Sequence, residues 1–114
     1  PPGKELRAII ESYLSEEHCA DPAGGCPIAA LASEVARHPR AVRKAMDRAL
    51  MLNGPAIARY MPGATEAERR GKTIALMSAM AGSMGMARAV ADEGLRRTIL
   101  DSARRMFLEA FCRE

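Results

Sequence analysis

Aromatic residues are scarce in this chain, at 4% of the sequence with no tryptophan, whereas apolar residues overall make up 48%. Runs of aromatic and β-branched residues, which are typical of strands, are almost missing. Alanine, methionine and leucine are prominent instead, and these residues favour helices. The composition therefore predicts an all-α protein. The length of 114 residues fits one domain, residues 1–114, that is large enough to bury a real core.

Long apolar runs and targeting segments are also lacking. No run of 18 apolar residues and no secretory signal is found, which predicts a cytoplasmic protein without a membrane partner. The formal net charge of +3 is mild and does not require an acidic partner. A basic ridge could contact phosphates, but no aromatic residues interleave with it, so a solvated helix face is the favoured interpretation. The ridge consists of Arg37, Arg40, Lys44 and Arg48.

Residues that carry chemistry are few. The three cysteines, Cys19, Cys26 and Cys112, lack the spacing of zinc ligands. Cys19 and Cys26 could pair on oxidation, but reduced thiols are the default for a chain without a secretion signal. Neither His18 nor His38 has a serine or cysteine nucleophile at a recognisable spacing. We therefore expect no catalytic residue, no metal site and no cofactor.

The stretch Thr73–Ala87 holds no charged residue and has no polar face as a helix. It is too short to span a membrane, which needs about 20 residues, so protein must cover it on all sides. One side carries the small residues Ser78, Gly82, Gly85 and Ala89, and the opposite side carries Leu76, Met80, Met84 and Ala87. The small side can accept a close helix neighbour. A second copy of the chain and a buried central helix of a monomer explain the pattern equally well.

Apolar spacing and capping residues predict five helices with no strand. A loop is expected over 15–25, and Gly54-Pro55 predicts a kink or short break inside the third helix. Thr65-x-x-Glu68 is a capping box, Asp92 caps the last helix, and Asp101–Arg105 is a favourable ion pair. The fold class is an all-α five-helix bundle whose last two helices form an antiparallel hairpin. The expected helices lie at 4–14, 27–37, 40–61, 66–90 and 93–111.

The run Asp21–Arg37, which contains Gly25-Cys26-Pro27 and Ser33-Glu34-Val35-Ala36, resembles the ligand domain of tetracycline-repressor-like (TetR/AcrR) transcriptional regulators. The later segments 62–65 and 87–92 are similar to the same family. The resemblance implies a C-terminal domain that binds a small, often apolar effector and dimerises through its last two helices. The family's N-terminal helix-turn-helix domain is absent from this chain. Operator DNA is therefore expected to bind only through that absent domain, whether the chain is a fragment or a naturally short protein.

Inward-facing residues on three helices predict an apolar effector pocket with adaptable methionine walls. The predicted walls are Leu31, Val35, Met46, Leu50, Asn53, Ile57, Met80 and Met84. Asn53 would orient the effector, although the favoured alternative is that it satisfies backbone groups freed at Gly54-Pro55. The homodimer interface is predicted at Ser78, Gly82, Gly85, Ala89, Ile99, Ala103, Met106 and Ala110. A solid core, a small cysteine-dependent enzyme and a ligand-free interaction module remain as alternatives.

Overall fold

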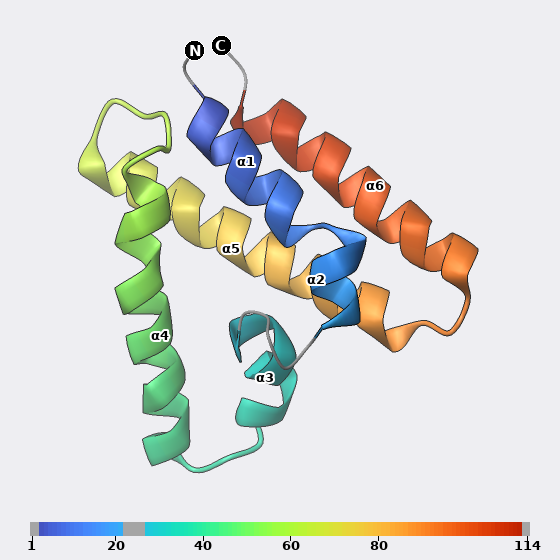
Figure 1. The fold of residues 1–114 in the computed structure, drawn as a ribbon. Helices are drawn as coiled ribbons and strands as arrows, with labels where there is room; N and C mark the ends of the chain where they lie inside the picture. The colour runs from blue at the N-terminus through green and yellow to red at the C-terminus, as the bar shows by residue number, and fades with distance from the viewer. Residues whose placement is uncertain (1–2, 22–26, 113–114) are drawn as a thin grey trace.

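The computed structural model describes residues 3–21 and 27–112, in which every regular element is a helix. The predicted all-α class is therefore confirmed, with five helices of nine residues or more and one short additional helix, α2 (Figure 1). None of the helices in the described ranges is long and apolar enough to cross a membrane. The elements in chain order are α1 (Lys4–Tyr13), α2 (Glu16–Ala20), α3 (Pro27–Val35), α4 (Arg40–Ala58), α5 (Glu66–Ala89) and α6 (Glu93–Phe111).

The predicted starts of α5 and α6 are confirmed by their capping hydrogen bonds. The Thr65 hydroxyl accepts the Glu68 N–H at 3.1 Å, and the Asp92 carboxylate accepts the Leu95 N–H at 2.7 Å. The Glu68 carboxylate reaches back to the N–H of Ala64, one residue before the position usual in a capping box. Each cap satisfies a donor that the first helical turn would otherwise leave without a partner.

Two local predictions need correction. The first part of the expected loop at 15–25 forms α2, because the Ser15 hydroxyl caps it by accepting the His18 N–H at 3.1 Å. Residues 22–26, including Cys26 and its possible pairing with Cys19, lie outside the described residues. Asp101 pairs with Arg104 rather than with Arg105, because Arg104 turns toward α1, where it also donates to the Leu14 carbonyl.

Helix α4 continues through Gly54-Pro55, where the sequence predicts a kink or short break. A residue before proline avoids the helical region because its Cβ and N–H meet the proline ring. Gly54 has no Cβ, which removes part of that clash. Pro55 also leaves the carbonyl of Met51 without its usual donor, and Met51 lies on an exposed side of the helix. The helix therefore tolerates a proline that would end it in another context.

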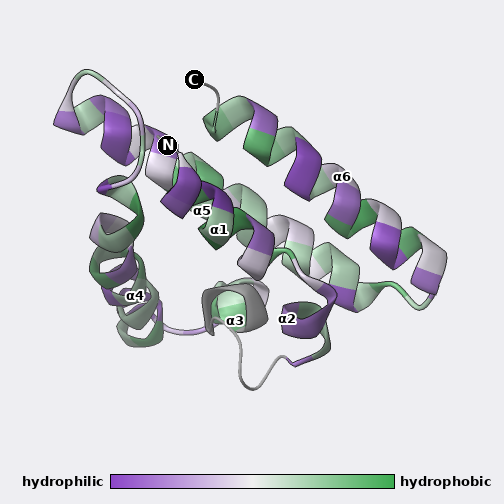
Figure 2. Cartoon of the chain, turned by 45° about the horizontal axis from the view of Figure 1, so that its top comes forward, coloured by the Kyte–Doolittle hydropathy of each residue, from purple (hydrophilic) through white to green (hydrophobic). Residues whose placement is uncertain are grey.

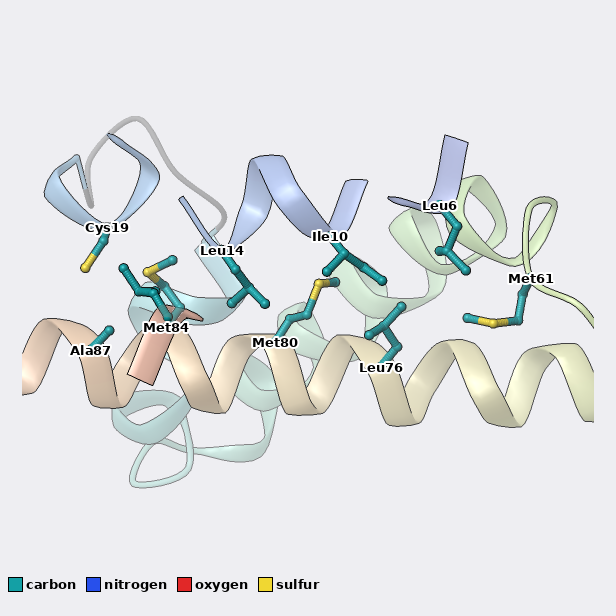
Figure 3. Close-up of a cluster of buried hydrophobic side chains, with 10 residues drawn as sticks. Leu6, Ile10, Leu14, Cys19, Met61, Leu76, Met80, Met84 and Ala87 are labelled. Carbon is teal, nitrogen blue, oxygen red and sulfur yellow. The ribbon is translucent and has the colours of Figure 1, made fainter. Parts of the chain in front are cut away.

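The core lies where α1 packs on the central helix α5. Leu76, Met80, Met84 and Ala87 are buried, and Figure 3 shows them directed toward side chains of α1 and α2. The α1 and α2 side of this core comprises Leu6, Ile10, Leu14 and Cys19, and Met61 closes it beside Leu6. The large side of the uncharged stretch thus faces its own subunit, as the sequence predicts.

Arginine side chains join the first elements to the last ones. Arg88 of α5 donates to the carbonyls of His18 and Cys19 at 2.7 and 3.2 Å, which satisfies the end of α2. Along α6, hydrophobic and hydrophilic residues alternate in Figure 2, as expected for a helix with one face in the core. Leu100 is the fully buried residue of that face. The result is a flat molecule of about 38 × 37 × 19 Å, close to two helix diameters thick.

Candidate functional site: a groove between α4 and α5

A groove with a volume of about 700 Å³ lies between the second half of α4 and the first half of α5. Figure 1 shows α4 crossing α5 near its first turns and standing apart from α1. The volume falls in the range of small-molecule sites. Its lining residues are Asp47, Leu50, Met51, Gly54, Pro55, Ala58, Arg59, Glu66, Arg69, Arg70, Thr73 and Ile74.

The base of the groove is apolar and owes its space to small residues. Leu50 and Ala58 are half-buried and Gly54 is buried, although a Cβ added to Gly54 would meet nothing within 4 Å. Glycine therefore leaves room at this position that any larger residue would occupy. The buried Thr73 hydroxyl donates to the Arg69 carbonyl at 2.8 Å, so it is satisfied within its own helix. An apolar ligand can rest on this base without displacing a hydrogen bond.

Charged side chains line the rim of the same groove. Arg69 donates to the Gly63 carbonyl at 2.9 Å, and this bond holds its guanidinium at the start of α5. Arg59 and Arg70 are exposed and add two guanidinium groups to the lining, which also contains Asp47 and Glu66. Guanidinium groups bind carboxylates and phosphates through pairs of parallel hydrogen bonds. The groove thus suits an amphipathic molecule with an apolar body and a polar end.

The structure distributes the predicted pocket residues over several places. Leu50 lines the groove, whereas Val35 and Met46 line a second hollow of about 350 Å³ between α3 and α4. Ile57 packs against the core. Met80 is 2% exposed and Met84 is fully buried, and both belong to the core beneath α1. The prediction that all these residues face one shared cavity is therefore not reproduced by this arrangement.

Two of the predicted pocket residues do not face inward at all. Leu31 is 46% exposed and Asn53 is exposed on the outside of α4. The Asn53 amide donates to the Ala49 carbonyl at 2.7 Å, one turn earlier, so it does not satisfy the carbonyl that Pro55 frees. Both interpretations of Asn53 as a buried amide are therefore corrected. Helical spacing correctly predicts that Asn53 lies on the same side of α4 as Leu50 and Ile57. It does not predict that the Asn53 side chain is exposed while those two are half-buried.

Sequence reasoning missed the α5 wall of the groove. Glu66, Arg69 and Arg70 lie in a polar segment, which periodicity assigns to solvent. They meet a ligand-sized space only because α4 crosses α5 near its first turns. The crossing depends on which side chains pack at the contact, and a single helix pattern does not encode it. No signal in the segment itself would have identified this wall.

The small-residue side of α5 is open to solvent. Ser78, Gly82 and Ala89 are exposed and Gly85 is half-buried, and a Cβ on either glycine would meet nothing within 4 Å. On α6, Met106 is 64% exposed and Ala110 is exposed, whereas Ile99 and Ala103 are half-buried and pack against the chain's own core. The chain by itself thus covers one side of the uncharged stretch and leaves the other bare.

The thiols in the described part of the chain are poorly suited to nucleophilic chemistry. Cys19 is buried, and burial raises the pKa of the Cys112 thiol from its ordinary value, which disfavours the reactive thiolate. Within residues 3–21 and 27–112, no three side chains of His, Cys, Asp or Glu are grouped so that they could hold a metal ion. The groove between α4 and α5 is the candidate binding site, because its lining is mainly apolar, whereas that of the hollow between α3 and α4 is mainly polar.

Comparison with known proteins gave one family. The model of the family described as "Tetracyclin repressor-like, C-terminal domain" matches residues 2–103, which is most of the chain. No curated protein and no solved structure matched the chain. The family match covers α1 to α5 and the first half of α6, so it includes both walls of the groove.

Proposed function

Since the chain belongs to the family of tetracyclin repressor-like C-terminal domains, we propose that it is the effector-binding and dimerisation domain of a transcriptional repressor. In this proposal the domain is non-catalytic and works in the cytoplasm. It binds a small, largely apolar effector and operates as a homodimer. Operator DNA is read by a separate helix-turn-helix domain.

The groove between α4 and α5 is the observation that carries the effector proposal. Its apolar base is formed by Leu50, Gly54 and Ala58, and its volume of about 700 Å³ suits a drug-sized molecule. The guanidinium groups at the rim would orient a polar end. Of the pocket residues predicted from the sequence, Leu50 is the one that this proposed site retains.

The bare side of α5 supports the dimer proposal. Beside the small residues, Met86 of α5 is 60% exposed, and Leu95 and Met106 of α6 are also exposed. Large exposed apolar residues next to small ones form the kind of surface that a second helix pair can cover. The last two helices of both subunits would then form a four-helix bundle, which is symmetric about a two-fold axis.

A shared helix would link the two proposed activities. Helix α5 contributes one wall of the groove near Arg69 and Ile74, and it would contribute the proposed dimer surface near Gly82, where the chain leaves open space. An effector that prefers one packing of α4 against α5 would shift the population of dimer arrangements. The spacing of two DNA-binding heads would change with it, and that spacing decides whether both half-sites can be bound.

The groove can be tested with the dye 8-anilinonaphthalene-1-sulfonate, which has an apolar body and an anionic end. Ala58→Leu should weaken dye binding at least tenfold, because the added carbons fill the base of the groove. Ala45→Leu is the matched control, since Ala45 is exposed on the same helix and does not line the groove. Fluorescence titration measures both affinities. Equal affinities for the two variants would refute the proposed site.

Native mass spectrometry of the purified chain would show whether an effector is retained.

A further inference from the structure

The positive charge of the chain is concentrated in one segment. Residues 34–48 hold five of the 17 lysines and arginines but only Glu34 and Asp47 of the 14 acids. The surplus within this segment equals the formal net charge of +3 for the whole chain. The remaining sequence is therefore balanced. The five cations, called here the basic segment, are Arg37, Arg40, Arg43, Lys44 and Arg48.

Within residues 3–21 and 27–112, the side chains of the basic segment have no acidic partners. All five cations are exposed, and the ion pairs and side-chain hydrogen bonds found among the described residues involve none of them. Cations elsewhere are often engaged: Arg7 pairs with Glu11, and Lys72 with Glu68. Arg96 binds two backbone carbonyls. The basic segment thus presents charge that the fold does not use.

The position of these cations also works against folding. Arg40, Arg43 and Lys44 occupy the start of α4, where the helix dipole disfavours positive charge. The first turn of α4 holds no acid, and no side chain caps it. By contrast, the first turns of α5 and α6 contain glutamates and have side-chain caps. Helix stability therefore does not explain the cations.

We propose that the basic segment contacts the phosphates of duplex DNA without reading its sequence. Arg40, Lys44 and Arg48 follow one another at four-residue intervals, so they form a row of about 12 Å along α4. A duplex carries one negative charge per about 1.7 Å of its axis, so such a row meets phosphates in any register. The inference rests on the proposed function in one respect: a regulator's DNA-binding heads would hold this domain beside DNA, where weak contacts gain effect.

A membrane surface is the less suitable anionic partner. A helix that binds membranes lays an apolar face into the interface. The face of α4 opposite the row packs inside the molecule, where Met46, Leu50 and Ile57 are half-buried against neighbouring helices. No aromatic residue lies among positions 34–48, so stacking on the bases of single strands is not supported either. Phosphate contacts to a duplex need only the charges.

The test is anisotropy of a fluorescently labelled duplex of arbitrary sequence, titrated with the chain from about 50 to 200 mM potassium chloride. The variant R40Q/K44Q/R48Q should bind more weakly, and its plot of log affinity against log salt should be shallower by up to about 2.7. The matched control K4Q/R97Q/R105Q removes the same charge from exposed positions elsewhere and should keep most of the salt dependence. Neutralising the row should not lower the melting temperature, which shows that the variant is folded.

Equal losses in the two variants would overturn the proposal, because net charge alone would then explain the binding. Lack of duplex binding at the lowest salt would also overturn it, as would row-dependent binding to phosphatidylserine vesicles without binding to the duplex. The dye titration on the same variants separates this inference from the proposed function. If the chain binds the dye but its duplex binding does not depend on the row, only the phosphate contacts are contradicted. If duplex binding depends on the row but the chain does not bind the dye, only the proposed groove is contradicted.

Discussion

Methionine 80 illustrates how a single residue distinguishes a packed core from a binding cavity. It is 2% exposed and lies among Ile10, Leu76 and Met84 in the core cluster. Met80→Ala should lower the free energy of unfolding by about 2–5 kcal/mol, because the surrounding side chains cannot fully fill the space. Urea denaturation measures the change. The control Met51→Ala removes a side chain that is 68% exposed and should cost about 0.5 kcal/mol or less.

A small loss in Met80→Ala would contradict the core packing and would favour the methionine-walled pocket expected from the sequence. The sequence could identify which side of α5 carries Met80 and Met84, because the small and large residues alternate with helical spacing. It could not decide whether that side meets a solid core or a cavity. The decision depends on how closely α1 approaches, and the spacing of residues within one helix does not determine that distance.

At the scale of the element, the start of α5 is stabilised by a charged cap. The N–H of Ala64 and, second, Lys72 lower the pKa of the Glu68 carboxyl from its ordinary value. A carboxyl with a lowered pKa in the folded state stabilises the fold at pH values above its pKa in the unfolded chain. That contribution is lost as the pH falls through the pKa in the folded state.

Glu68→Gln should therefore reduce the melting temperature at neutral pH and have less effect in acid. The difference from the unchanged chain should shrink as the pH falls below about 4, the ordinary range for glutamate. Melting curves recorded by circular dichroism across pH give this comparison. Glu66→Gln is a suitable control, because Glu66 also lies in the first turn but accepts none of the side-chain hydrogen bonds found there. If the melting temperature of Glu68→Gln matched that of the unchanged chain at every pH, the charged cap would contribute nothing to stability.

The starts of the helices were the most predictable features, because their chemistry is local, whereas α3 and α4 end two and three residues earlier than expected. Thr65 and Asp92 mark the starts of α5 and α6 through side chains that lie within three residues of their partners. The sequence did not predict the short α2, because the helix-breaking residues around Asp21 favoured a loop over the whole segment. The capping role of Ser15 was therefore not considered. The α4–α5 crossing was missed for a different reason: the angle between two consecutive helices depends on which side chains pack at their contact, and the pattern of either helix alone does not determine it.

For the whole molecule, the bare side of α5 leads to a prediction about assembly. Gly82→Leu should weaken the proposed homodimer, because four added carbons would keep two α5 helices from approaching closely. Within one subunit the substitution meets open space, so the fold should remain intact. Sedimentation at several concentrations measures the dimer constant. Ala8→Leu, at an exposed position on α1, is the control and should leave the constant unchanged.

A chain that sediments as a monomer at micromolar concentration would contradict the dimer proposal itself. The sequence showed that the uncharged stretch needs cover on all sides, and the chain alone supplies cover on one. Composition and periodicity could indicate that need. Composition and periodicity could not say whether a second copy of the chain or another protein covers this side of α5, because the surface of the partner is not encoded in the stretch that it covers.

The pairing of α1 with α5 has a consequence for how the protein is made. Leu6, Ile10 and Leu14 are synthesised well before most of the core residues that bury them, which lie between Met61 and Leu100. The arginine bonds that join His18 and Leu14 to the last two helices span 70 and 90 residues. Contacts over such separations form slowly, because a long loop must close first. The apolar side of α1 therefore stays exposed until α5 and α6 have been synthesised, and chaperones can bind there during that time.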